Sequence, residues 1–319
     1  MSKNLSQQVV LDRRGFVAAT FATVAGLGLA GCSDTSAEAD KGSAAGSSKG
    51  SEDTEVSAEL DAKAFDKLVD NGPKADDDAI AASTWATAVK DAGVFKIGGV
   101  QTSTLFSLLN EKDGQTRGFD AGIAQLLSNY ILGENKVEIT QVTSDTRESV
   151  LQNGQVDAVF ATYTITDERK KSWDFSTPYR TDYVGLMVKK RSGFTSIEDL
   201  DGKVIGVSQG SNTQGLIEQM IKDNGISCKP EFRAFSGYPI IKSSLDAGNI
   251  DVFAMDRSTL AGYMNETVEL LQPEVKFGEQ GYGVATKKGC DLSAVVDQVI
   301  CDRLADGWLD QEVKTWGLV

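Results

Sequence analysis

The chain has 319 residues, a formal net charge of −14 and a pI of about 4.6. The length allows two domains, and the acidic balance argues against a nucleic acid partner, because phosphates need basic patches. Histidine is absent, which excludes Ser-His-Asp and Cys-His catalysis and histidine metal sites, and we expect neither a metal nor another cofactor.

The N-terminal residues 1–32 have the pattern of an export signal. Arg13 and Arg14 precede an apolar run over residues 16–30, which is too short for a comfortable transmembrane helix. The arginine pair resembles a twin-arginine signal, and Leu29-Ala30-Gly31-Cys32 resembles a bacterial lipobox. We therefore expect cleavage before Cys32 and lipidation of that residue. An uncleaved anchor or a buried helix is the alternative.

Two further segments precede the main body of the chain. Residues 33–58 are rich in serine, alanine, glycine and acidic residues, which predicts a disordered tether. Residues 59–92 carry spaced apolar side chains and predict two short helices separated by Asn71-Gly72-Pro73. We expect this helical extension to pack on the main body, and we find no chemistry in it.

From residue 94 the chain alternates strands and helices, and the order βαβαβα occurs twice. The predicted strands are 94–100, 137–142, 156–161, 204–207, 229–235 and 250–255, and the predicted helices are 119–132, 146–152, 167–171, 212–223, 238–246, 257–264 and 294–305. A short sequence motif also repeats, because residues 151–157 and 245–251 share leucine, glycine and aspartate at matching positions. This pattern predicts an α/β fold of two lobes with mostly parallel sheets.

Polar residues follow the third strand of each half. Thr162, Thr164 and Arg169 follow the first, and Asp256 occupies in the second half the place of Thr162. Because ligands of such sheets bind at the carboxyl ends of strands, two facing lobes would offer an anion receptor and a carboxylate, which suits an α-amino acid. An exposed Arg169 paired with an acid, and an Asp256 that caps the next helix, are the alternatives.

Several motifs of the main body occur together over residues 93–317. They are GFD at 118–120, TITDER at 164–169, WDFS-x-PY at 173–179, LDGK at 200–203, QGS at 209–211, IDV at 250–252 and WG at 316–317. Together they resemble family 3 solute-binding proteins of ABC importers for polar amino acids. The resemblance implies a type II periplasmic-binding-protein-like fold with a two-strand hinge near residues 185–190 and 278–285. Lobe one would comprise residues 93–187 and 284–319, and lobe two residues 188–283.

The resemblance also implies roles for individual residues. Arg169 would pair with the ligand α-carboxylate, together with Thr164. The helix N-terminus at Ser211 and Asn212 would donate to the same carboxylate from the other lobe. Asp256 would take the α-ammonium group, with Thr162 and Thr164 assisting.

The identity of the amino acid depends on Arg147. In glutamate- and aspartate-binding members an arginine at this place meets the side-chain carboxylate, with a polar partner where this chain has Ser144. Some of those members carry a second arginine near Gln101, and this chain has none. Glutamate is therefore the leading ligand, with glutamine or another polar amino acid next, and Gln101 remains a candidate ligand contact. Alternatively, Arg147 only pairs with a neighbouring acid.

Phe106 and the cysteines allow more than one interpretation. Phe106 packs either on the aliphatic part of the ligand or in the core. Cys228, Cys290 and Cys301 are either buried thiols or disulfide partners, although Cys290 and Cys301 would lie too far apart to pair if one helix holds both.

We therefore expect a monomeric binding protein rather than an enzyme. It would be anchored to the outer face of the bacterial cell membrane by Cys32 and would deliver its ligand to the permease subunits of an ABC importer. A dehydratase-like enzyme and a ligand sensor on the same scaffold are the alternatives.

Overall fold

The computed structural model describes residues 61–75 and 77–318, all of which belong to one compact unit, Thr54–Val319. The expected export signal, Cys32 and the expected tether lie outside the described residues. No helix in the described part of the chain is both long and apolar enough to cross a membrane.

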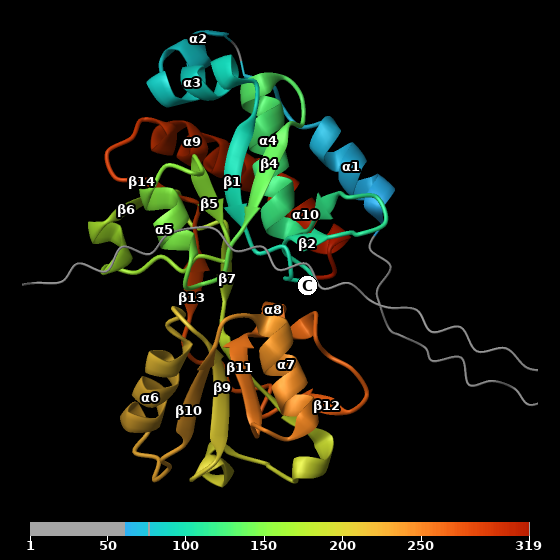
Figure 1. Ribbon diagram of the computed structural model, residues 1–319, viewed down its shortest axis with the longest axis vertical. Coiled ribbons are helices and arrows are strands. Elements are labelled where there is room, and N and C mark those ends of the chain that lie inside the picture. Colours follow the sequence, from blue (N-terminus) through green and yellow to red (C-terminus); the bar gives the residue numbers. More distant parts are fainter. Residues whose placement is uncertain (1–60, 76, 319) are drawn as a thin grey trace, which may run out of the picture. The chain divides into compact units, whose positions relative to one another are not determined.

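The first lobe is built on a five-stranded mixed sheet (Figure 1). Its order is β4 (Val137–Gln141), β1 (Phe95–Gly99), β5 (Ala158–Phe160), β14 (Ala285–Lys287) and β6 (Trp173–Phe175). The first three strands are parallel, whereas β14 runs antiparallel to β5 and to β6. The associated helices are α4 (Phe119–Leu132), α5 (Arg147–Gln152), α9 (Leu292–Ala305) and α10 (Trp308–Thr315).

The second lobe repeats this plan. Its sheet has the order β10 (Glu231–Phe235), β9 (Val204–Ser208), β11 (Val252–Asp256), β8 (Val184–Lys189) and β12 (Val268–Leu270), and its helices are α6 (Thr213–Asp223), α7 (Tyr238–Ala247) and α8 (Arg257–Ala261). Here β10, β9 and β11 are parallel, and β8 runs antiparallel to both β11 and β12. In each sheet four strands therefore point the same way and one, β14 or β8, runs against them, because that strand directly follows a crossing between the lobes.

The repeat seen in the sequence has a structural counterpart. Asp157 accepts the Lys96 backbone N–H at 3.0 Å, and Asp251 accepts the Val204 backbone N–H at 2.9 Å, each from the first strand of its own half. The matching aspartates thus tie matching strands together. Two copies of one supersecondary unit place the carboxyl ends of β5 and β11 in equivalent positions.

Two short strands join the lobes. β7 (Arg180–Asp182) and β13 (Gln280–Tyr282) pair antiparallel and run between the two large sheets (Figure 1). The first crossing comes earlier than the sequence suggested, because Val184–Lys189 is an interior strand of the second sheet with β11 and β12 on either side. Residues 184–187, expected in lobe one, therefore lie in the sheet of the second lobe. The second crossing falls within the expected residues 278–285.

The N-terminal extension forms three helices, where two were expected. They are α1 (Ala62–Asp70), α2 (Asp77–Ala81) and α3 (Thr84–Ala92). The additional break occurs at Ser83, whose hydroxyl accepts the Ala86 N–H and caps α3. Buried apolar residues of all three helices, among them Phe65, join the core of the first lobe. The Phe65 ring packs edge-on against Trp316, the residue that follows α10, at 5.1 Å between centroids.

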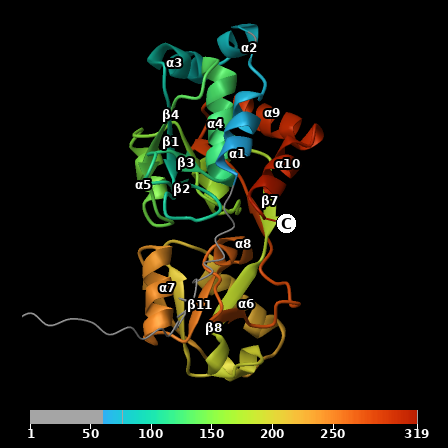
Figure 2. The same ribbon diagram turned by 90° about the vertical axis from the view of Figure 1, so that its right-hand side faces the viewer.

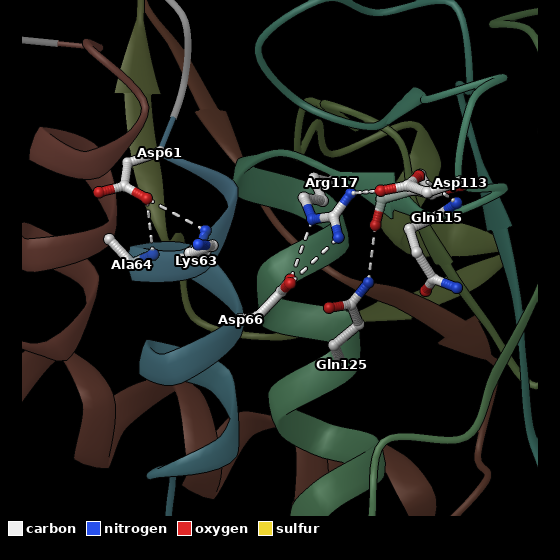
Figure 3. A network of polar contacts seen from close by, with 9 residues as sticks. Asp61, Lys63, Ala64, Asp66, Asp113, Gln115, Arg117 and Gln125 are labelled. Carbon is white, nitrogen blue, oxygen red and sulfur yellow. Dashed lines mark hydrogen bonds and ion pairs between the residues drawn. The ribbon is translucent and has the colours of Figure 1, made fainter.

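A polar contact fastens α1 to the first lobe. Arg117, in the hairpin of β2 (Leu108–Leu109) and β3 (Thr116–Arg117), donates to both carboxylate oxygens of Asp66 at 2.9 and 3.0 Å (Figure 3). Arg117 also donates to Asp113 at 2.8 Å. In both ribbon views α1 runs beside α4 (Figures 1 and 2). The extension is therefore an integral layer of the first lobe.

The remaining elements are single 3₁₀ turns. They are η1 (Arg169–Lys171), η2 (Lys190–Ser192) and η3 (Ile197–Leu200). The helix expected over residues 167–171 is thus only one turn. Glu168 is the residue at its N-cap, and the Thr166 hydroxyl, two residues earlier, accepts the Arg169 N–H at 3.2 Å. The turn stops at Ser172 because the chain must enter β6 at the next residue.

Candidate ligand-binding site

The loop after β5 leaves the sheet in a strained conformation. Thr162 has φ 42°, in the left-handed region that threonine rarely adopts. Its N–H donates to the buried Asp120 carboxylate at 2.7 Å, and the Tyr179 hydroxyl donates to the other oxygen at 2.8 Å. Burial raises the pKa of Asp120 to about 6. A buried carboxyl group from α4 thus fixes the turn on which the predicted Thr162 and Thr164 lie.

Two arginines share one aromatic platform. The guanidinium carbon of Arg147 lies 3.8 Å from the Tyr163 ring centroid, and that of Arg169 lies 4.6 Å from it. The Tyr163 hydroxyl donates to Glu148. Stacking on an aromatic face attracts a guanidinium and fixes its plane. Tyr163 therefore orients both predicted cations and brings them together at the end of β5.

Arg169 reaches from one lobe to the other. Its Nη1 donates to the Thr164 carbonyl oxygen at 2.8 Å, and its Nη2 donates to the Gly210 carbonyl oxygen at 3.4 Å in the second lobe. Burial, followed by the charge of Arg147, lowers the pKa of Arg169 to about 10. No ion pair within the described residues involves Arg169, so the expected alternative of a surface pair is absent there.

Arg147 is more deeply buried. It is 3% exposed, donates from Nη1 to the Ala161 carbonyl oxygen at 3.0 Å, and has no hydrogen-bond partner at Nε among the described residues. Within that part of the chain it forms no ion pair with Asp145 or Glu148. Burial lowers the pKa of Arg147. A buried cation without an anion is costly, so an anion placed here would be stabilised.

Asp256 ends β11 and is 1% exposed. Its side chain does not cap α8, because it lies instead 2.6 Å from the Tyr282 hydroxyl oxygen and accepts from the Gln280 amide. The Gln280 carbonyl oxygen accepts from the Thr164 hydroxyl at 2.8 Å. Burial, then the charge of Asp182, raises the pKa of Asp256 to about 7. A chain of hydrogen bonds through the hinge strand therefore links Thr164 to Asp256.

The second lobe meets this cluster around residues 208–212. The Ser208 hydroxyl lies 3.4 Å from that of Ser144, and a Cβ atom on Gly210 would lie 2.7 Å from the Ser144 carbonyl oxygen. The Ser211 hydroxyl donates to the Ser208 carbonyl oxygen at 2.7 Å. Asn212 precedes α6 without a side-chain capping bond. Ser144 thus lies at the contact between the lobes, and the N-terminus of α6 begins beside it.

Two predicted site residues are engaged elsewhere. Gln101 donates from its side chain to the Thr116 hydroxyl at 3.0 Å, and its N–H donates to Gln141. Phe106 is 1% exposed and belongs to the core of the first lobe, where it packs edge-on against Phe119 and Tyr282. The core interpretation of Phe106 therefore holds, although the ring it contacts bears a hydroxyl bonded to Asp256.

Sequence reasoning missed several members of the cluster. Tyr163 and Gln280 are central to it, and the hydroxyl of the buried Tyr238 lies close to Ser144 and Thr162. The sequence offered a signal for two of them, because Tyr163 lies between the predicted contacts Thr162 and Thr164, and Gln280 is a polar residue at the start of a short strand. The three cysteines Cys228, Cys290 and Cys301 are free thiols, and within the described residues no group of three or more cysteine or acidic side chains is arranged to hold a metal ion.

Comparison with known proteins shows which family the chain belongs to. A model of the bacterial extracellular solute-binding proteins, family 3, matches residues 95–319. The chain belongs to this family. The resemblance noted from the sequence motifs is thereby confirmed, and helices α1 to α3 lie before the matched region.

Three relatives of this solute-binding protein have curated names. The ABC transporter glutamine-binding protein GlnH of Bacillus subtilis is 35% identical over 223 residues, covering 68% of this chain and 79% of that protein. The glutamine-binding protein of Geobacillus stearothermophilus is 34% identical, and the match covers 63% of this chain and 75% of that protein. The glutamate-binding protein GluB of Corynebacterium efficiens is 28% identical, and the match covers 62% of this chain and 70% of that protein.

Solved structures confirm the fold of this solute-binding protein. The solute receptor for L-cysteine of Neisseria gonorrhoeae has a TM-score of 0.65 at 24% identity, with 72% of this chain and 92% of that chain covered. The ancestral amino acid-binding protein AncCDT-1, described as a precursor of cyclohexadienyl dehydratase, has a TM-score of 0.63 at 28% identity, with 72% and 98% covered. The expected type II binding-protein fold is therefore confirmed.

Proposed function

We propose that this protein binds a polar amino acid between its lobes, with glutamate favoured, and delivers it to the permease of an ABC importer. The relatives named for glutamine and glutamate, one of them an ABC transporter component, support the class of ligand and the partner. A lipid on Cys32 would keep the monomeric protein at the outer face of the cell membrane.

The charge of the buried cluster carries the choice of glutamate. Arg147 and Arg169 place two cations within reach of one platform, and Asp256 supplies a carboxyl group facing the same region. Glutamate carries two carboxylates and one ammonium group, so each of its charges would find an opposite charge. Arg147 has a donor without a partner among the described residues, which favours a ligand with an acceptor at its side-chain end.

Each residue then has a defined role. Arg169 would hold the α-carboxylate, and Thr164, Ser211 and the backbone at Asn212 would add donors. Asp256 would hold the α-ammonium group beside Thr162, and Arg147 would hold the side-chain carboxylate beside Ser144. The contacts of Arg169 with both lobes support this assignment, because a carboxylate there would bridge them.

Glutamine is the second candidate. Two of the relatives compared are named for glutamine and exceed the glutamate-binding relative in identity. Some acidic-ligand members carry a second arginine near the position of Gln101, where this chain has none, and the Gln101 amide is bonded to Thr116. One arginine at the side-chain end could also donate to an amide carbonyl oxygen.

Calorimetry of the full chain in mild detergent with the twenty amino acids tests the proposal. We expect micromolar binding of glutamate, weaker binding of glutamine and no turnover of either. Absence of binding to every amino acid would refute the proposed function, and chemical conversion of a bound ligand would favour an enzyme related to the dehydratase lineage.

The choice between the two ligands depends on Arg147. Arg147→Gln should cost glutamate about 2–5 kcal/mol, as for one partner of a buried charge pair, and should cost glutamine far less. Arg233→Gln is the matched control, because Arg233 is exposed and donates to the Asn249 backbone in the second lobe. Equal losses for both ligands would mean that Arg147 is structural.

A further inference from the structure

One tyrosine hydroxyl lies between two buried carboxyl groups at the hinge. The Tyr282 hydroxyl oxygen is 2.6 Å from Oδ2 of Asp256 and 3.0 Å from Oδ2 of Asp182. Tyr282, Asp256 and Asp182 are 0%, 1% and 5% exposed. Asp182 ends β7 and Tyr282 ends β13, so the two hinge strands meet the ligand site at this point.

The number of protons in this group decides its charge. A phenol has one proton, so it donates to only one of two carboxylates. If both aspartates were ionised, the phenol oxygen would face the lone pairs of the carboxylate to which it does not donate. Such a contact between two acceptors is costly where water is excluded. One of the two carboxyl groups must therefore carry a proton and donate it to the phenol oxygen.

The surroundings identify which aspartate is protonated. Asp182 already accepts from the Ser258 N–H at 3.1 Å, from the Ser258 hydroxyl, and from the Tyr183 N–H at 2.7 Å. Three donors stabilise an ionised carboxylate. Asp256 has only the Gln280 amide besides the phenol. The proton therefore resides on Asp256, and Tyr282 donates to Asp182.

The charged and titratable groups around Asp256 keep this proton easy to remove. Arg147 from α5 and Arg169 from η1 favour the ionised form of Asp256, whereas Asp182 from β7 opposes it. Tyr238 from α7 and Tyr282 from β13 complete the set. Burial and Asp182 together raise the pKa of Asp256 to about 7.

We infer that Asp256 is protonated when no amino acid is bound, and that the arriving α-ammonium group displaces this proton into the solvent. Asp182 and Tyr282 are then positioning residues that set the charge of Asp256 without touching the ligand. After the proton leaves, the Tyr282 hydroxyl can turn to Asp256, because Asp182 retains its three other donors. Protons and the ligand thus compete, so affinity falls as the pH drops through the titration of Asp256. This inference rests on the proposed function.

The test measures proton release during binding. Calorimetric titrations of the full chain with glutamate in several buffers of different ionisation enthalpy give the number of protons released. We expect about 0.5–1 proton at pH 6 and less than about 0.2 at pH 8.5. Glutamine, if bound, should release the same proton, because it carries the same ammonium group. Binding without any buffer dependence at pH 6 would overturn the inference, whereas absence of binding at every pH would overturn the proposed function instead.

Asp182→Asn separates positioning from mere structure. The substitution removes the charge that opposes ionisation of Asp256, so proton release at pH 6 should fall and affinity at pH 6 should rise about tenfold relative to the unmodified chain. Damage to the fold would instead lower the affinity for glutamate at pH 6 and at pH 8.5 alike. Asp223→Asn, at an exposed position at the end of α6, is the matched control and should leave both quantities unchanged. An unchanged proton release in Asp182→Asn would contradict the role given to Asp182.

Tyr282→Phe provides a second variant, since it removes the hydroxyl that Asp256 and Asp182 share. This substitution should also change the number of protons released on binding.

Discussion

Glu312 of α10 is a fully buried carboxyl group outside the candidate ligand-binding site. Neither oxygen has a hydrogen-bond partner among the described residues. The Glu312 carboxyl group fits there because residue 122 of α4 is a glycine, since a Cβ atom on Gly122 would lie 1.6 Å from Glu312 Oε1. The Phe65 ring of α1 also packs against Gly122. Burial, and then Asp120, raise the pKa of Glu312 well above its usual value. The side chain therefore folds in its neutral form, and ionising it must cost stability.

The pH dependence of unfolding tests this at Glu312. Because its folded pKa is raised, the stability it contributes is fully present below the unfolded pKa, about 4.5, and is lost as the pH rises through the folded value. Glu312→Gln cannot ionise, so its free energy of unfolding should improve relative to the unmodified chain by up to about 1.4 kcal/mol per pH unit in that window. Urea unfolding at pH 5 and pH 8 measures the difference. The exposed Glu274→Gln serves as control, and parallel curves for the two variants would refute the argument.

At the scale of elements, the extension is attached by a helix cap from a distant segment. Asp291, just before α9, accepts from the Ser83 hydroxyl at 3.0 Å and from the N–H groups of Thr84 and Trp85 at 2.8 and 3.0 Å. The Thr84 hydroxyl also donates to Asp291, and this bond, followed by that of the Trp85 N–H, lowers the pKa of Asp291 to about 2. An acid at a helix N-terminus is favoured by the free N–H groups and the helix dipole. Asp291 thus caps α3 across the sequence.

Asp291→Ala should loosen the extension. We expect a loss of about 0.5–2 kcal/mol in the free energy of unfolding, as for a lost N-cap, with faster hydrogen exchange confined to α3 and its neighbours. Asp91→Ala is the matched control, since Asp91 lies in the last turn of the same helix, where an acid is disfavoured. A loss as large in Asp91→Ala would show that the cap is not responsible.

For the described unit as a whole, the lobes meet at two places. Gly210 approaches Ser144, and Tyr263 donates from its hydroxyl to the Thr102 carbonyl oxygen at 2.7 Å. A Cβ atom on Gly262 would also lie 2.7 Å from the Thr104 Cβ atom. Glycine at these positions allows backbone from the two lobes to come together. The proposed binding between the lobes would therefore depend on how closely they can approach.

Gly210→Ala should hinder that approach. Its φ is 76°, and the added Cβ would lie 2.7 Å from the Ser144 carbonyl oxygen, so glutamate affinity should fall at least about tenfold. We expect ligand to reduce the radius of gyration of the unmodified chain by closing the lobes, and this reduction should be lost in Gly210→Ala. Gly202→Ala is the matched control, because its φ is 66° and nothing lies within 4 Å of its Cβ position. Both substitutions strain the backbone by about 1–2 kcal/mol, but only the first meets the other lobe. Calorimetry and solution scattering measure the outcome, and equal affinity in the two variants would contradict it.

The sequence by itself determined the repeated α/β halves, the family and the two strand ends that bear Thr162, Thr164 and Asp256. These follow from local periodicity and from residues close in the chain, because strands and helices of such length have strong patterns. It also identified Arg169 as part of an anion receptor and, through the family resemblance, Arg147 as a candidate contact for the side-chain carboxylate. The helix boundaries of the N-terminal extension and the position of the first hinge crossing depend on packing, and in the structure they differ from those expected from the sequence.

Only the tertiary structure decided how the charges are arranged. That Tyr163 holds both arginines, that Gln280 links Thr164 to Asp256, and that Tyr282 joins Asp256 to Asp182 are contacts between segments up to 116 residues apart. No local pattern encodes such a set of contacts, since its members come from different strands, helices and loops. Burial then sets their protonation, because desolvation depends on what the whole fold places around a group and not on its neighbours in the sequence.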